Sequence, residues 1–207
     1  MSLEIVRRIA SEAFTSPVFS GEIVFLWHLG EPLSVPVEFY EDAFVEIGRQ
    51  GAVAGREYVH SFQTNGVLLD SEWVSLIKRF RVRTGISIDG PEFIHDRHRV
   101  MRGGKGTHKA VMRGARLLRD ADIEFGAIAV LTAFTLQHPE AFFNFFRSEE
   151  IHQVGFNIDE IEGAHLTSSF SNSEAIAQYK RFVTRIMELS EADGGRLKFR
   201  EVWTTLR

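Results

Sequence analysis

The stretch 23–32, IVFLWHLGEP, joins a wholly apolar run to a Gly-Glu-Pro turn. An uninterrupted apolar run of this length is typical of a strand buried on both faces of a parallel sheet. Polar and turn-forming residues follow where that strand ends, in Gly30, Glu31 and Pro32. In parallel β/α folds this edge of the sheet is where ligands bind, although Gly-Glu-Pro alone is also an ordinary turn.

Two later stretches, 58–66 (YVHSFQTNG) and 82–91 (VRTGISIDGP), repeat the arrangement. Gln63 completes a predicted buried strand and therefore needs a partner or a ligand, whereas the Asn-Gly that follows is a common turn dipeptide. The spacing of Ser87 and Asp89 places both side chains on one face of their strand. A hydroxyl and a carboxylate on one face suit ribose hydroxyls, and an Asp before Gly-Pro equally suits a loop cap.

Hydrophobic periodicity predicts a helix at 2–15 with Ser2 as N-cap, then strands and helices in strict alternation. Asp70 is the predicted cap of the third helix. The predicted strands cover residues 22–28, 58–63, 82–88, 125–131 and 154–161. Such alternation predicts a parallel sheet with the helices packed outside it, in one domain over residues 1–207. Residues 196–207 are interpreted as the start of an unfinished C-terminal segment.

A long polar loop is predicted at 90–106, and long loops in compact domains are usually functional or mobile. Its His95, Asp96 and His98 match no standard metal-site spacing, so no metal site is predicted. The GGKGT at 103–107 differs from a phosphate-binding loop because Gly106 separates the lysine from the threonine. We therefore expect a flexible hinge that ends in Thr107 as a helix cap.

Acidic residues gather at the end of the last predicted strand, as Asp159, Glu160 and Glu162. Carboxylates at a barrel mouth can bind a basic peptide or transfer protons, and they can also form a solvated rim.

Composition limits the function classes. The 207 residues carry a net charge of −4 and no cysteine, with 44% hydrophobic residues. Disulfides and thiolate metal sites are therefore excluded for this chain, and a general nucleic-acid binder is disfavoured. Neither an apolar run long enough to span a membrane nor a signal-peptide pattern is found, so a cytoplasmic protein is expected.

The order and strand-end placement of these motifs over residues 1–165 resemble the radical S-adenosylmethionine (SAM) superfamily. The closer resemblance is to the peptide-modifying, SPASM-type branch that includes the anaerobic sulfatase maturases. The family shows Gly-Gly-Glu-Pro after a strand, and Leu29 here replaces the first glycine. It also shows His-Asp-x-x-Arg and Arg-x-Gly-x-Gly-Thr, which match residues 95–99 and 102–107.

The resemblance implies SAM as cofactor. Glu31 would hold the SAM amino group, Ser87 and Asp89 the ribose, and Arg99 the carboxylate. The full set of SAM-binding residues implied is Gly30, Glu31, Pro32, Gln63, Ser87, Asp89 and Arg99. No catalytic residue is identified.

The resemblance further implies a partial (β/α)6 TIM-like barrel whose first strand, with the Cys-x3-Cys-x2-Cys loop, is missing. Without cysteines this chain cannot bind the family's iron–sulfur cluster. The expected function is the core of a maturase that cleaves SAM to a 5′-deoxyadenosyl radical and modifies a peptide or small protein. Alone, the chain is expected to be inactive. The exposed sheet edge predicts oligomerisation or poor solubility.

Two other interpretations stay open. One is a cysteine-free, non-catalytic barrel that binds a peptide or SAM. The other is an unrelated β/α hydrolase that uses His95, Asp96 or the acidic residues at 159–162.

Overall fold

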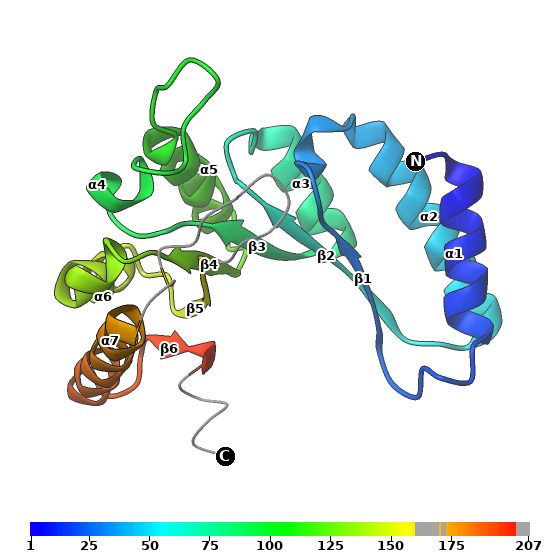
Figure 1. The fold of residues 1–207 in the computed structure, drawn as a ribbon. Coiled ribbons are helices and arrows are strands. Elements are labelled where there is room, and N and C mark those ends of the chain that lie inside the picture. The colour runs from blue at the N-terminus through cyan, green and yellow to red at the C-terminus, as the bar shows by residue number, and fades with distance from the viewer. Residues whose placement is uncertain (160–169, 171–172, 202–207) are drawn as a thin grey trace. The chain divides into compact units, whose positions relative to one another are not determined.

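The computed structural model describes residues 1–159, 170 and 173–201. Its strands form one sheet in the order β1-β2-β3-β4-β5-β6 (Figure 1). The strands are β1 (Ile23–Trp27), β2 (Tyr58–Thr64), β3 (Arg83–Ser87), β4 (Phe125–Leu131), β5 (Gln153–Ile158) and β6 (Lys198–Phe199). β1 pairs in parallel with β2, β4 with β5, and β5 with β6. The predicted parallel α/β class is confirmed.

Helices alternate with the strands, as the periodicity predicts. They are α1 (Leu3–Thr15), η1 (Pro32–Ser34), α2 (Val37–Ala54), α3 (Ser71–Phe80), α4 (Glu92–His95), α5 (His108–Asp120), η2 (Thr135–Gln137), α6 (Pro139–Ser148) and α7 (Ser173–Ala192). Two predicted caps are confirmed: Ser2 accepts the Ile5 N–H, and Asp70 accepts two N–H groups of the first turn of α3. Such caps satisfy backbone donors that the helix itself leaves unpaired.

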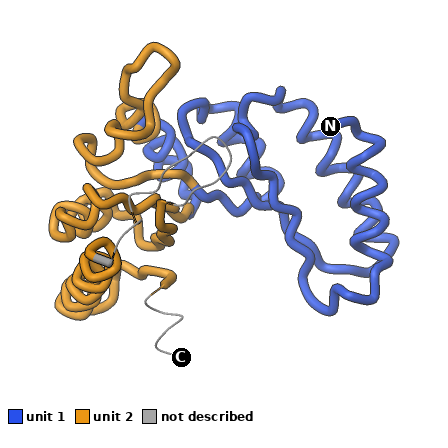
Figure 2. The backbone as a smooth tube through the Cα atoms, in the orientation of Figure 1, with its two compact units in different colours: residues 1–85, 113–124 blue, residues 86–112, 125–207 orange. Residues whose placement is uncertain are grey.

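The chain divides into two compact units, shown in Figure 2. Unit 1 comprises residues 1–85 and 113–124. In it α1 packs on α2, and α2 on α3. Its core is an aromatic network between these helices and the sheet: Phe14, Phe25, Trp27, Tyr40, Phe44, Tyr58, Phe62 and Trp73.

Unit 2 comprises residues 86–112 and 125–207. In it α6 packs on α7. The phenylalanines of α6 meet those of α7 and the sheet in a second aromatic core, made by Phe142, Phe146, Phe156, Phe182 and Phe199. These five phenylalanines are all buried.

β1 is not buried on both faces, so that prediction is wrong. Phe25 and Trp27 lie among the rings of α1 and α2, but Val24 and Leu26 are 50% and 58% exposed. Successive side chains of a strand point to opposite faces, and the helices of unit 1 cover one of them. An apolar sequence alone does not distinguish the covered face from the open one. Association through the β1 edge stays a prediction.

The loop expected at 90–106 is not wholly irregular. The loop at 90–106 contains the short helix α4 and a bridge that pairs Val100 with Gly106. Backbone hydrogen bonds close this part of the loop on itself. Lys198–Phe199, within the segment expected to begin a C-terminal extension, form β6, which pairs with β5.

No helix in the described part of the chain combines the length and the apolar character needed to cross a membrane.

Candidate functional site

Glu31 organises the carboxyl ends of β1 and β2 in unit 1. Its carboxylate accepts hydrogen bonds from Leu33 N at 3.0 Å, Thr64 Oγ1 at 2.5 Å and Asn65 N at 2.8 Å. These bonds connect the turn after β1 to the turn after β2 and cap the short helix η1. The sequence indicated Glu31 as a ligand-binding residue but gave no sign of Thr64, its partner on the neighbouring strand.

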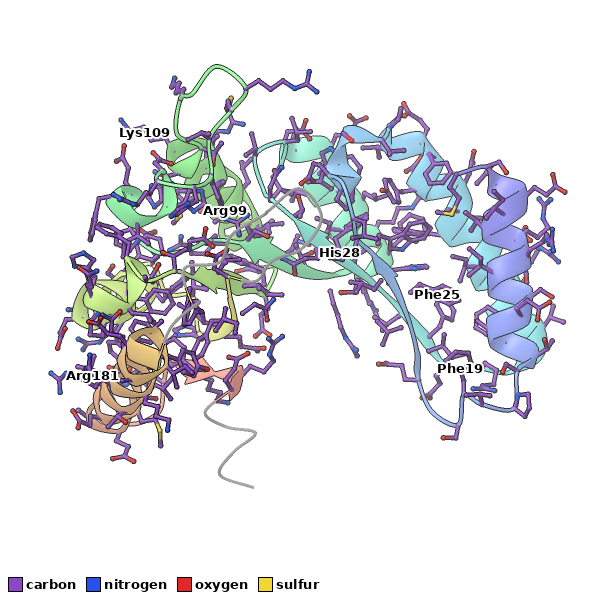
Figure 3. The ribbon with its side chains drawn as sticks, viewed as in Figure 1. Phe19, Phe25, His28, Arg99, Lys109 and Arg181 are labelled. Atoms are coloured by element: carbon purple, nitrogen blue, oxygen red, sulfur yellow. The ribbon has the colours of Figure 1, made fainter. Side chains whose placement is uncertain are left out.

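The turn before Glu31 has an unusual backbone. Leu29 and Gly30 lie in the left-handed region, with φ of 75° and 62°. Glycine adopts this region freely, whereas a leucine there is strained. No atom lies within 4 Å of the position a Gly30 Cβ would take, so the backbone at this point faces open space. His28, the first residue after β1, is exposed (Figure 3).

Pro32 is buried, and its carbonyl accepts a hydrogen bond from the hydroxyl of Tyr40 at 3.0 Å. Burial, with the nearby charge of Glu31 as the second cause, raises the pKa of Tyr40 to about 12. The phenol is therefore a permanent donor at neutral pH. Pro32 thus faces the interior of unit 1, while the neighbouring Gly30 is exposed.

Gln63 lies half-buried on β2, beside Gly85 of β3. A Cβ on Gly85 would come within 2.2 Å of the Gln63 Oε1. Glycine at position 85 therefore makes room for the Gln63 amide. The sequence indicated that this polar side chain needs a partner, but not that a glycine accommodates it.

Asp89 and Arg99 form an ion pair in unit 2. Arg99 donates from Nε to Asp89 Oδ2 at 2.7 Å and from Nη2 to Oδ1 at 3.0 Å. Asp89 Oδ1 also accepts the Val130 N–H of β4 at 2.8 Å. The Asp89 side chain is 7% exposed and that of Arg99 is 26% exposed. Within the described residues, Nη1 of Arg99 makes no hydrogen bond, so this nitrogen is available to a ligand.

Ser87 and Asp159, two further predicted site residues, lie at the ends of strands. Ser87 is the last residue of β3 and is half-buried. Asp159 follows β5 directly, and its N–H donates to the Leu131 carbonyl at 2.9 Å. Glu160 and Glu162 lie outside the described residues.

Asp96 supplies a side-chain acceptor at the N-terminus of α5. The first N–H of the helix, on His108, donates to Asp96 Oδ1 at 2.8 Å. The Thr107 hydroxyl instead donates to the Arg99 carbonyl at 2.9 Å. Thr107 stands at the N-cap position of α5, since its carbonyl accepts the Ala110 and Val111 N–H groups, each at 3.0 Å. The side-chain bond to this helix end comes from Asp96, 12 residues earlier in the chain.

Within the described residues, no group of three or more His, Asp or Glu side chains is placed to hold a metal ion. Asp96 is engaged with the backbone of α5, and both ring nitrogens of His95 have partners inside unit 2. These contacts do not support the hydrolase interpretation.

The family model of the radical SAM superfamily matches residues 3–146. An uncharacterized protein of Synechocystis sp. is 38% identical over 204 residues, which are 97% of this chain and 51% of that protein. The serine-type anaerobic sulfatase-maturating enzyme of Bacteroides thetaiotaomicron is 33% identical over 186 residues, 86% of this chain and 44% of that enzyme. The chain thus spans about half the length of these relatives.

Among solved structures, native anSMEcpe with bound AdoMet and the Kp18Cys peptide superposes with a TM-score of 0.85. The alignment covers 97% of this chain and 56% of that one, at 24% sequence identity. At this identity the likeness concerns the fold, and it agrees with the parallel sheet and outer helices described above.

Proposed function

Because the chain belongs to the radical SAM superfamily, we propose that it is the SAM-binding core of a peptide-modifying maturase. The sequence similarity to sulfatase-maturating enzymes supports the choice of a peptide as substrate. The activity of the whole protein is part of the proposal, since the chain spans only about half of these relatives.

Arg99 carries this proposal. Its Nε and Nη2 are held by Asp89, and its Nη1 makes no hydrogen bond within the described residues. A guanidinium fixed in this way is preorganised to donate to a carboxylate, which is the group that SAM offers at its methionine end. Asp89 then orients the arginine, because both of its oxygens already accept hydrogen bonds inside unit 2.

The other proposed SAM-binding residues fit in different ways. The exposed backbone at Gly30 leaves space for close approach of a ligand. Glu31 is proposed to hold the SAM ammonium, although its oxygens also fix the turn after β2. Ser87 and Gln63 are proposed to meet the nucleoside end, as polar groups on or next to β3. Pro32 is proposed only to shape the turn, since it is buried.

The iron–sulfur cluster does not fit this chain. A cluster of the family's type is held by cysteine thiolates, and none of the 207 residues is a cysteine. SAM bound to the family's enzymes supplies a 5′-deoxyadenosyl group for hydrogen abstraction. We propose that this chain binds and orients SAM and leaves radical generation to cysteines that it does not carry.

Calorimetric titration of the purified chain with SAM tests the proposal. Arg99→Lys keeps a cation beside Asp89 and removes Nη1, so the affinity for SAM should fall about tenfold, the usual effect of losing a charge-assisted hydrogen bond. Arg102→Lys is the matched control, because Arg102 is an exposed arginine of the same loop, and it should bind like the unmodified chain.

The proposal is refuted if the folded chain does not bind SAM. It is also refuted if Arg102→Lys loses as much affinity for SAM as Arg99→Lys does. A parallel titration with a substrate-like peptide in the absence of SAM addresses the alternative of a peptide-binding module.

A further inference from the structure

His95 is the most deeply buried polar side chain in the part of unit 2 that surrounds Arg99. Its side chain is 0% exposed, and it lies at the end of α4. Its Nδ1 is 3.3 Å from the backbone nitrogen of Asp89, and its Nε2 is 3.0 Å from the hydroxyl oxygen of Thr107. The SAM-binding residues proposed above do not include His95 or Thr107.

The hydrogen bonds fix the state of the imidazole. The Asp89 N–H can only donate, so Nδ1 must be an unprotonated acceptor. The Thr107 hydroxyl gives its proton to the Arg99 carbonyl at 2.9 Å, so its oxygen is free to accept from His95 Nε2–H. His95 is therefore the neutral tautomer with its proton on Nε2.

This tautomer links the two members of the ion pair. One ring nitrogen holds the backbone of Asp89, and the other holds the backbone of Arg99 through the hydroxyl of Thr107. Backbone bonds run beside this path, from Arg99 N to the His95 carbonyl at 3.0 Å and from Thr107 N to the Arg99 carbonyl at 3.1 Å. Arg99 is thus fixed at its side chain by Asp89 and at its backbone by His95 and Thr107.

Gly106 and Asp96 complete the connection between the two segments. A Cβ on Gly106 would lie 2.0 Å from Asp96 Oδ2, so a side chain at that position would displace the carboxylate that caps α5. Residues 95–99 and 106–108 therefore interlock through side chain to backbone contacts. The contact with Asp96 requires a glycine at position 106, and the contacts with His95 and Arg99 use the hydroxyl of Thr107.

We propose that His95 and Thr107 are positioning residues that hold Arg99 and Asp89 in the geometry that receives the SAM carboxylate. The inference rests on the proposed function, because it gives a role to residues that do not themselves touch SAM. It deepens that function by naming which residues keep the free Nη1 of Arg99 in place.

The surroundings of His95 favour the neutral ring. Burial lowers its pKa to about 4, the charges of Asp89 and Asp96 act in the opposite direction, and those of Arg99 and His108 add to the lowering. At neutral pH the ring is therefore uncharged, as the hydrogen bonds require. Protonation would place the second proton of the ring on Nδ1, against the Asp89 N–H.

Thr107→Val tests the inference because it replaces the hydroxyl by a methyl group of similar shape. The variant should bind SAM about tenfold more weakly, the effect of one buried hydrogen bond lost in this path. Thr107→Ser restores the hydroxyl and should bind within about twofold of the unmodified chain. Thr84→Val is the matched control, since Thr84 is a buried threonine of unit 1 whose hydroxyl contacts only the Val82 carbonyl among the described residues.

A second readout does not depend on SAM. In NMR spectra of the free chain, the Arg99 Nε–H should exchange with solvent faster in Thr107→Val than in Thr107→Ser. Long-range proton–nitrogen correlations should show the Nε2–H tautomer of His95 in the unmodified chain. His95→Asn, which can keep the acceptor for Asp89 but not the contact with Thr107, should accelerate the same Arg99 exchange.

The outcomes separate the two proposals. SAM binding that is equal in Thr107→Val and the unmodified chain overturns the positioning role. If the unmodified chain does not bind SAM, the proposed function fails, and the Arg99 exchange rate alone then decides: faster exchange in Thr107→Val supports the positioning role, and an unchanged rate overturns it. A protonated Nδ1 at neutral pH also overturns it.

Discussion

Acid should destabilise unit 1 through the buried histidine His60. His60 is 3% exposed, and its ring stacks on Phe44 with centroids 3.9 Å apart and planes 13° from parallel. Neither ring nitrogen has a partner within the described residues, and the nearby Trp27 Nε1 has none either. Burial lowers the pKa of His60 to about 4 from an ordinary 6.5.

The direction in which stability changes with pH follows from the lowered pKa of His60. Between pH 6.5 and pH 4, His60 is protonated in the unfolded chain but not in the folded chain. The free energy of unfolding therefore falls as the pH falls through this window. For pKa values of about 4 and 6.5, the loss between pH 7 and pH 5 is about 2 kcal/mol for one histidine. His95, whose pKa is also lowered to about 4, adds a similar loss in unit 2.

His60→Phe keeps the stacked ring and removes the titrating nitrogens. We expect it to abolish the His60 contribution, so that acidification to pH 5 costs about 2 kcal/mol less than in the unmodified chain. It should also raise stability at pH 7 by about 1 kcal/mol, because buried polar atoms without partners are removed. Urea unfolding followed by tryptophan fluorescence is suited to this, since Trp27 and Trp73 both lie in unit 1.

His98→Phe is the control, because it makes the same replacement of histidine by phenylalanine at an exposed position. The reasoning about His60 is refuted if the His60→Phe variant and the unmodified chain lose the same stability between pH 7 and pH 5.

Substitutions at three other positions test the backbone and the caps. Leu29→Gly relieves a left-handed backbone at an exposed residue (φ 75°) and should add about 1 kcal/mol to the free energy of unfolding, measured in urea; an unchanged midpoint would contradict the strain. Gly114→Ala brings a methyl group 2.6 Å from the Gly66 carbonyl oxygen and should cost about 1–3 kcal/mol, whereas a gain in thermal stability would show that the backbone yields. Asp96→Ala removes the acceptor of the His108 N–H and should cost about 1 kcal/mol, with faster hydrogen exchange at that amide; unchanged exchange would exclude the cap.

Local patterns predicted the elements well because they depend on neighbouring residues. Alternating apolar runs and helical stripes located the strands and helices, and Ser2 and Asp70 act within three residues of their own position. The contact of Asp96 with the start of α5 could not be predicted in this way. Asp96 reaches His108 across 12 residues, and only the closed backbone of the intervening loop brings them together.

The same limit applies to the candidate site. Position at a strand end and chemical type made Glu31 and Asp89 candidates, and the resemblance to the radical SAM family added Arg99. The sequence could not show that the Asp89 carboxylate accepts hydrogen bonds from Arg99 and Val130. These bonds form only because the fold brings two loops and a neighbouring strand together. A pattern identifies a residue that can bind a ligand, whereas the structure shows which of its hydrogen bonds are already used.

The contacts around Arg99 also bear on what a chain without cysteines can do. Asp89, His95 and Thr107 all belong to unit 2, and their hydrogen bonds to Arg99 need no metal ligand and no cluster. An arginine held on its side chain and its backbone loses little freedom when a carboxylate arrives, and such preorganisation preserves affinity. If Arg99 receives the SAM carboxylate as proposed, this part of SAM binding is separable from radical chemistry. The Thr107 variants then measure the binding half of the function in the absence of the other half.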